Sequence, residues 1–239
     1  MLLTLDRGNT TLDVMLHGPV PRRARLEPRE PLVAFLGRDR PSAAVAVTVV
    51  PNALATALAE LQQLGVPVAQ IGIDLRCPLP LDYDTPETLG ADRWLSALAA
   101  HRRWGRAVVV DCGSATTVNL IEDDGTFRGG AIAPGLRALS HGMSVITPHL
   151  PEADVRSASD VPPRSSATAV HTGLLLSYCG AIERMVADTV AVARGPCTVV
   201  ITGGHAEDYL RRGRLRPVVA PDLVHQGLHL CAVESGWSC

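Results

Sequence analysis

The stretches MLLTLDRGNT (1–10) and AVVVDCGSATT (107–117) share one pattern in two distant parts of the chain. Each starts with an apolar run of strand type and ends in an aspartate, Asp6 or Asp111, with a glycine two residues later. Small hydroxyl or amide side chains come next, followed by a second strand-like run. One such acidic turn is a common turn former, but two in the same context predict that the chain contains two related halves.

The segments around the two acidic turns predict a similar order of elements in both halves. In the first half, we expect strands at 1–5, 12–16, 43–50 and 66–73, a connection or short edge strand within 18–32, and helices at 51–65 and 89–105. In the second half, we expect strands at 106–111, 116–121 and 197–202, a hairpin turn at 122–125, a glycine-rich turn at 129–135, and helices at 136–145 and 167–193. The expected fold class is therefore α/β, with two tandem domains covering residues 1–105 and 106–239.

Composition narrows the classes of function that the chain can have. The chain has 239 residues, 46% of them hydrophobic, and a net charge of −2, which gives it no general attraction for nucleic acid or an anionic membrane. All 22 basic residues are arginine, so Schiff-base chemistry and the lysine of a phosphate-binding P-loop are excluded. The six cysteines form no close pairs, and no 18-residue apolar run occurs. We expect a soluble cytoplasmic protein with idle thiols.

The two acidic turns combine groups that bind phosphate with a group that repels it. Glycine lets the backbone N–H groups of such a turn point together at an anion, and Asn9, Thr10, Ser114 and Thr116 add neutral donors. An aspartate beside a phosphate is unfavourable unless a cation lies between them. The pattern therefore indicates a polyphosphate held with a cation, and Mg²⁺ fits best because it keeps waters and shares phosphate oxygens.

The segment LGADRW (89–94) places an aspartate and an arginine next to each other at the expected start of a helix. Asp92 can be a structural residue that caps the helix, because an acid in the first turn stabilises it by about 0.3–1 kcal/mol. No cap needs the adjacent Arg93, however. The pair also suits a site that binds a small carboxylate substrate and positions a base near its hydroxyl, and the sequence leaves both interpretations open.

The segment ITGGHAEDYL (201–210) ends an apolar strand in paired glycines. Paired glycines allow a flat group such as adenine or ribose to approach the backbone, although TGG alone is usually a plain turn. The eight histidines form no cluster, and only His205 is of interest because it follows this turn. The arginine-rich runs PRRARLEPRE and LRRGRLRP are expected on solvated surfaces.

The ordered set of motifs resembles the ASKHA superfamily of acetate and sugar kinases and actin, and more narrowly the type III pantothenate kinase family. The resemblance covers nearly the whole chain and rests on DRGNT (6–10), TVVP (48–51), Tyr83 with LGADR (89–93), DCGSATT (111–117), GGAIAPG (129–135), SSATAVHTG (165–173) and TGG (202–204). It implies two tandem RNase H-like domains with a nucleotide cleft between them. The implied activity is ATP-dependent phosphorylation of pantothenate to 4′-phosphopantothenate, the first step of coenzyme A biosynthesis.

The resemblance also implies roles for individual residues. Asp92 matches the general base, Asp6 a Mg²⁺-binding position, and Asp111 the ligand of an activating monovalent cation, K⁺ or NH₄⁺. The implied nucleotide-binding residues are Asp6, Arg7, Gly8, Asn9, Thr10, Thr11, Gly113, Ser114, Thr202, Gly203 and Gly204. The implied pantothenate-binding residues are Tyr83, Gly90, Ala91, Asp92, Arg93 and Ser166. The family works as a homodimer that completes the pantothenate pocket across its interface.

Three positions depart from the family pattern. The second turn reads GSAT instead of GTAT, Ser166 replaces a threonine, and Arg7 stands where a small apolar residue is common. The serines keep the hydroxyl, and Arg7 could shift the local charge near the cation.

Two alternative functions remain open at this point. A small ASKHA kinase acting on a sugar would share the acidic turns but need a pocket of Asn, Glu and His. A catalytically silent regulatory relative would bind nucleotide without turnover, although such relatives are expected to lose their acids first.

Overall fold

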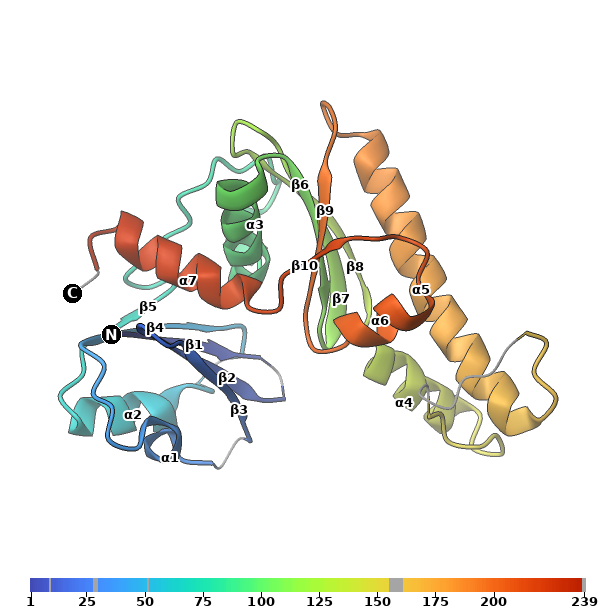
Figure 1. Ribbon diagram of the computed structural model, residues 1–239, viewed down its shortest axis with the longest axis horizontal. Helices are drawn as coiled ribbons and strands as arrows, with labels where there is room; N and C mark the ends of the chain where they lie inside the picture. The colour runs from blue at the N-terminus through green and yellow to red at the C-terminus, as the bar shows by residue number, and fades with distance from the viewer. Residues whose placement is uncertain (9, 28–29, 51, 155–160, 238–239) are drawn as a thin grey trace. The chain divides into compact units, whose positions relative to one another are not determined.

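The computed structural model describes residues 1–8, 10–27, 30–50, 52–154 and 161–237. The chain divides into two compact units, Met1–Arg102 with Asp222–Cys239, and Arg103–Pro221 (Figure 1). The expected domain 106–239 thus includes a C-terminal segment that folds with the first unit. The reason is that this segment forms a helix packed on the first sheet, as described below.

The first unit is built on a five-stranded sheet with the order β3-β2-β1-β4-β5. The β1–β2 and β2–β3 pairs are antiparallel, whereas β1–β4 and β4–β5 are parallel. The strands are β1 (Leu2–Arg7), β2 (Leu12–His17), β3 (Arg22–Leu26), β4 (Ala43–Thr48) and β5 (Val68–Gln70). The 18–32 segment therefore contributes an edge strand, one of the two forms expected for it.

The two faces of this sheet differ in character. Leu3, Leu5 and Val14 point to the face that forms a hydrophobic core with the helices α1 (Leu32–Leu36) and α2 (Ala55–Gln63). The opposite face is covered by α7 (Leu223–Glu234), which contacts β1 and β4. The remaining helices of the unit are the short 3₁₀ helix η1 (Pro86–Thr88) and α3 (Ala91–Trp104).

The second unit repeats the same sheet. Its order is β10-β9-β6-β7-β8, in which β6 pairs antiparallel with β7 and parallel with β9, as β1 does with β2 and β4. The strands are β6 (Ala107–Cys112), β7 (Ala115–Ile121), β8 (Phe127–Pro134), β9 (Thr198–Thr202) and β10 (Val218–Val219). The equal order and direction of the two sheets confirm the prediction of two related α/β halves.

One long helix supplies much of the core of the second unit. The helix α5 (Ser166–Ala191) contacts β6 and β7, and its Tyr178 and Ile182 are buried with Val108 and Val110 (Figure 1). Two shorter helices, α4 (Leu136–Ile146) and α6 (Ala206–Arg212), pack against α5. No helix in the described part of the chain is long and apolar enough to cross a membrane.

Several elements were not predicted, among them α1, α6, α7 and β10, and one segment was predicted wrongly. The segment 129–135 was expected to be a glycine-rich turn, but most of it lies in β8, where a Cβ on Gly130 would lie 1.8 Å from the Val118 carbonyl oxygen of β7. The glycines thus permit close strand pairing. The helix α7 was not expected, because apolar residues surround it and Gly227 interrupts it. Gly227 fits against α3, since a Cβ there would lie 2.1 Å from the Leu95 carbonyl oxygen.

Candidate active site

The first acidic turn lies at the carboxyl end of β1. Asp6 is partly buried and stands opposite Val47 of β4 and Asp13 of β2. Arg7 donates from Nη1 to the carbonyl oxygen of Gly8 at 2.8 Å, so its guanidinium is bonded to the backbone of the turn. The carbonyl of Arg7 accepts from Thr48 Oγ1 at 3.1 Å, which ties the turn to β4.

The other predicted residues of this turn differ in their placement. Thr10 is exposed and Thr11 is partly buried. The predicted residue Asn9 lies outside the described residues.

The second acidic turn lies against the paired glycines of the TGG turn. Asp111 lies near the end of β6 and pairs with Thr202 of the neighbouring parallel strand. Gly203 has a φ of +93°, and a Cβ there would lie 2.5 Å from Asp111 Oδ1. The backbone N–H of His205 donates to the Cys112 carbonyl at 2.9 Å, which closes the TGG turn against the DCG turn.

The last glycine of the segment GGAIAPG packs against the backbone of the second acidic turn. A Cβ on Gly135 would lie 2.4 Å from the carbonyl oxygen of Gly113 and 2.5 Å from that of Ser114. The backbone N–H of Gly135 also donates to the Ser114 carbonyl at 3.2 Å. Only glycine allows this approach, which leaves the Ser114 side chain exposed.

The neighbouring residues Asp92 and Arg93 lie at the start of α3. Asp92 is partly buried, and its Oδ1 accepts from the backbone N–H of Arg93 at 2.9 Å. Burial raises the pKa of Asp92 above its ordinary value, although the backbone N–H and the charge of Arg93 oppose the rise. A Cβ at position 90 would lie 2.7 Å from Asp92 Oδ1, so any larger residue there would displace this carboxylate.

Arg93 connects the start of α3 to Tyr83, which lies earlier in the chain. It is buried, and its Nη1 donates to the hydroxyl of Tyr83 at 3.2 Å. The guanidinium carbon also lies 5.7 Å from the centroid of the Tyr83 ring, within cation–π range. Three predicted substrate residues, Tyr83, Asp92 and Arg93, are therefore neighbours. Asp92 does bond to the first turn of its helix, so both of its proposed roles are compatible with the geometry.

Ser166 belongs to a different element from the other predicted substrate residues. It is the first residue of α5 and is exposed. Its neighbour Ser165 is the N-cap, and Ser165 and Thr168 form a reciprocal capping box. The capping role in this segment is thus performed by Ser165, and Ser166 is exposed in the first turn of the helix.

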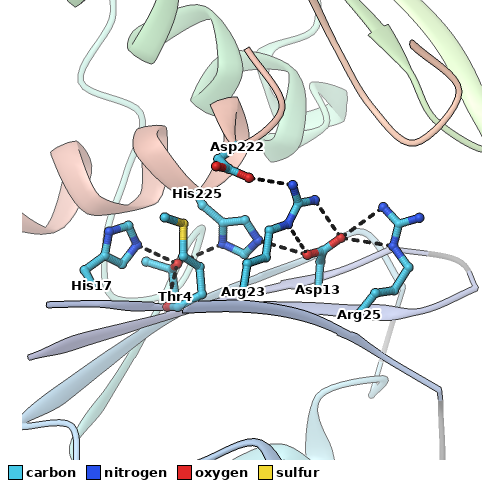
Figure 2. A network of polar contacts seen from close by, with 8 residues as sticks. Thr4, Asp13, His17, Arg23, Arg25, Asp222 and His225 are labelled. Atoms are coloured by element: carbon cyan, nitrogen blue, oxygen red, sulfur yellow. Dashed lines mark hydrogen bonds and ion pairs between the residues drawn. The ribbon is translucent and has the colours of Figure 1, made fainter. Parts of the chain in front are cut away.

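Sequence reasoning missed a charged network on the α7 face of the first sheet (Figure 2). Arg23 donates to Asp13 from Nε at 2.7 Å and from Nη2 at 2.9 Å, and Arg25 donates to it at 3.2 Å. His225 of α7 lies 3.4 Å from the same carboxylate. Arg23 and Arg25 are exposed, as expected for a solvated surface, but both also form ion pairs with Asp13. The period of two in RRARL could have shown that Arg23 and Arg25 share one face.

The donor set at the first acidic turn fits a magnesium ion that is held jointly with phosphate. Among the described residues, no group of three or more His, Cys, Asp or Glu side chains could hold a metal by itself. One carboxylate with nearby hydroxyls matches the usual coordination of Mg²⁺, which keeps several waters and takes its other ligands from substrate phosphates.

The duplicated sheets place the chain in a known fold class. This chain matches the structure of a Baf family transcriptional activator from Campylobacter jejuni, with a TM-score of 0.64 and 20% identity. The match covers 99% of this chain and all of that one. A ROK family glucokinase from Streptomyces griseus matches over 99% of both chains, with a TM-score of 0.53 and 12% identity. These likenesses, with the sheet order, define the duplicated ASKHA fold that the sequence predicted.

Closer relatives identify the family. The model of the type III pantothenate kinase family matches residues 2–188. A type III pantothenate kinase from Rhizorhabdus wittichii is 31% identical, over 95% of this chain and 96% of the relative. One from Nitratidesulfovibrio vulgaris is 34% identical, over 95% and 83% respectively. The chain belongs to the type III pantothenate kinase family, and it is therefore a phosphotransferase of an ATP-using kinase family.

Proposed function

We propose that this chain transfers the γ-phosphoryl group of ATP to the primary hydroxyl of pantothenate, which forms 4′-phosphopantothenate for coenzyme A biosynthesis. Family membership supports the reaction class. The observation that carries the substrate assignment is the neighbouring set of Asp92, Arg93 and Tyr83 at the start of α3. An acid beside a buried arginine suits a substrate with a hydroxyl at one end and a carboxylate at the other.

Asp92 is the proposed general base. Its raised pKa makes it a better proton acceptor than an ordinary aspartate, which at a pKa of about 3.9 is weak toward an alcohol. Phosphoryl transfer passes through a loose transition state, so the proton leaves late and orientation of the hydroxyl matters most. Asp92 would first accept a hydrogen bond from the hydroxyl and then take its proton.

Arg93 and Tyr83 are proposed to hold pantothenate through its carboxylate and carbonyl oxygens. Their mutual bond at 3.2 Å and their stacked arrangement fix both side chains before substrate arrives, which lowers the entropy lost on binding. Gly90 and Ala91 leave room beside the Asp92 carboxylate because neither carries a long side chain. Ser166 is proposed to contribute its exposed hydroxyl to the same substrate.

Both acidic turns are proposed to take part in binding the nucleotide. Magnesium bound with ATP would neutralise the phosphates, and Asp6 would hold it together with the Thr10 and Thr11 hydroxyls and the backbone from Arg7 to Asn9. Asp111 is proposed to hold K⁺ or NH₄⁺ beside Gly113 and Ser114. The TGG turn, Thr202 to Gly204, is proposed to lie against the adenosine, since its glycines allow close approach.

A homodimer is proposed from an exposed apolar surface on the second unit. Ile132 of β8, Val145 and Ile146 of α4, and Leu176 of α5 are all exposed. The helix α4 contacts both β8 and α5, so these side chains lie on α4 and on two elements next to it. Exposed apolar patches of this kind mark interaction surfaces, and most soluble oligomers are symmetric dimers.

A substrate panel tests the proposal. Purified protein is incubated with Mg·ATP and either pantothenate, glucose or N-acetylglucosamine, with and without K⁺, and ADP release is recorded. We expect ADP release with pantothenate and not with either sugar, and we expect K⁺ to stimulate it. Turnover with a sugar would establish the sugar-kinase alternative. Nucleotide binding without turnover on any acceptor would support the regulatory alternative.

A further inference from the structure

His205 directly follows the TGG turn, and its backbone is tied to the second acidic turn. Its N–H donates to the Cys112 carbonyl at 2.9 Å, and its own carbonyl accepts from the N–H of Tyr209 at 3.3 Å. Gly204, the residue before it, is exposed, and the side chain of His205 is 26% exposed. A ligand that lies against the TGG turn can therefore reach this imidazole.

The side chain of His205 does not cap the helix that it begins. It occupies the N-cap of α6, a helix that the structure describes in full, but it makes no side-chain cap hydrogen bond. Within the described residues, its side-chain bond runs from Nδ1 to Oδ2 of Asp208, at 3.0 Å. Asp208 lies in the first turn of α6, and its side chain is only 16% exposed. The imidazole is therefore held in place without being used as a cap.

The bond to Asp208 decides which ring nitrogen carries the proton. A carboxylate only accepts hydrogen bonds, so Nδ1 is the donor, and Nε2 of the neutral ring is then an acceptor. The other carboxylate oxygen, Oδ1, lies 3.6 Å from Nη1 of Arg211, so Asp208 is held from both sides. His205 thus presents a fixed hydrogen-bond acceptor next to the TGG turn.

We propose that Nε2 of His205 accepts a hydrogen bond from the nucleoside part of ATP, and that Asp208 is the positioning residue that makes Nε2 an acceptor. The inference rests on the adenosine position proposed above for the TGG turn. Adenosine offers suitable donors in its 2′ and 3′ hydroxyls and in the 6-amino group of its base. Guanine carries a carbonyl oxygen at the corresponding ring position, so contact with the 6-amino group would also favour ATP over GTP.

Nucleotides that each lack one of these donors test the contact. Isothermal titration calorimetry gives Kd for the magnesium complexes of ATP, 2′-deoxy-ATP, 3′-deoxy-ATP and ITP, whose base has a carbonyl instead of the 6-amino group. The buffer is kept at pH 8.5, above the range in which an imidazole ordinarily gains a proton. We expect wild type to bind at least one analogue about three- to tenfold more weakly than ATP, as the loss of one hydrogen bond predicts.

Variants decide whether His205 is responsible for that difference. His205→Phe keeps a ring without an acceptor, and it should bind ATP and one such analogue within about twofold of each other. The analogue whose deficit disappears identifies the donor that His205 contacts. The matched control, Arg211→Gln, removes the other partner of Asp208 and should keep the wild-type ratio. General loss of structure weakens all four nucleotides together, so the ratio separates recognition from a structural role.

Asp208→Asn tests the positioning role, and it also decides the matter if His205→Phe does not fold. The new amide can donate to Nδ1, and we expect the ring proton to move to Nε2, which nitrogen-15 NMR of the ring detects. The ratio must follow the tautomer: it falls to about one where Nε2 carries the proton, and it stays at the wild-type value where Nδ1 does. A wild-type ratio with the proton on Nε2 would overturn the inference.

The remaining outcomes separate this inference from the proposed function. If His205→Phe keeps the full ratio for every analogue, or if wild type binds all four nucleotides equally, His205 does not contact the nucleoside, while the proposed function stands. If wild type binds none of the four nucleotides, the proposed function fails and the inference fails with it.

Discussion

The two five-stranded sheets have the same order and directions, yet the residue that faces each acidic turn differs. Asp6 stands opposite Asp13, whereas Asp111 stands opposite Thr117. Thr117 is buried and accepts a hydrogen bond from Asn119 at 3.0 Å, so the second sheet is neutral where the first carries two acids and two arginines. The two sheets thus share their strand order and directions but differ in the charges beside the acidic turns.

The two turns also differ in how tightly they are packed. A Cβ added to Gly8 would meet nothing within 4 Å, whereas one on Gly203 would overlap Asp111 and the backbone of Cys112. The first turn is therefore open, as a turn that admits a solvated ion needs to be. The second is closed against the TGG segment, which fixes the position of Asp111.

The largest expected effect separates the two acids. Asp6→Asn should lower kcat/KM for Mg·ATP about 100-fold, because the carboxylate is the proposed protein ligand of the cation. Asp111→Asn should instead remove activation by K⁺ and leave a basal rate that no longer depends on K⁺. Steady-state rates across Mg²⁺ and K⁺ titrations measure both. Equal responses of the two variants to both cations would refute the division between the turns.

The next effect tests the difference in packing. Gly203→Ala should lower the free energy of unfolding by about 2–4 kcal/mol, because the new Cβ overlaps backbone atoms and φ is +93°. Gly8→Ala, the matched control, should stay within about 0.5 kcal/mol of wild type. Urea unfolding curves give both values. A Gly203→Ala variant as stable as wild type would show that the second turn is loose.

The histidines under α7 provide a pH test that applies to the first sheet only. His17 lies 2.9 Å from Thr4 Oγ1, and its ring centroid is 4.7 Å from that of His229. Burial, followed by the charges of His229 and His225, lowers the pKa of His17 from 6.5 to about 4. In the unfolded chain this histidine binds a proton near pH 6.5, but in the folded chain it does not. Its contribution to the free energy of unfolding is therefore fully present above pH 6.5 and is lost as the pH falls toward 4.

The slope from this group should be less than about 1.4 kcal/mol per pH unit, since the ring is only partly buried and solvent screens it. His17→Gln removes the titration but keeps a donor for Thr4, so its free energy of unfolding should depend less on pH between 6.5 and 4. Urea titrations at pH 7, 6 and 5 provide the comparison. An unchanged slope in the variant would exclude His17 as the source.

The smallest effect concerns the loop that faces α3. Tyr83→Phe removes one hydrogen bond to Arg93 but keeps the stacked ring, which costs about 0.5–1.5 kcal/mol. We expect KM for pantothenate to rise about twofold to tenfold, with kcat and KM for ATP nearly unchanged. Initial rates at varied pantothenate measure this. A change confined to KM for ATP would place Tyr83 with the nucleotide instead.

The sequence predicted what depends on local pattern. The repeat of an apolar run, an aspartate and a glycine located both acidic turns, and short apolar runs of strand type located β1, β2, β6 and β7. It could not locate α7, whose apolar residues face the sheet on one side and α3 on the other. It also assigned 129–135 to a turn instead of β8, because the reason for Gly130 is a carbonyl on the neighbouring strand. The Asp13–Arg23 pair was missed for a similar reason, since strand pairing brings these distant residues together.

The most direct test of this account is the chemical step itself. Rapid-quench measurements with wild type and Asp92→Asn, both at saturating Mg·ATP and pantothenate, give the rate of 4′-phosphopantothenate formation. We predict that the variant loses about 10²- to 10⁴-fold in this rate while its Kd for ATP stays the same. A variant that phosphorylates pantothenate at the wild-type rate would contradict the assignment of Asp92 as the base.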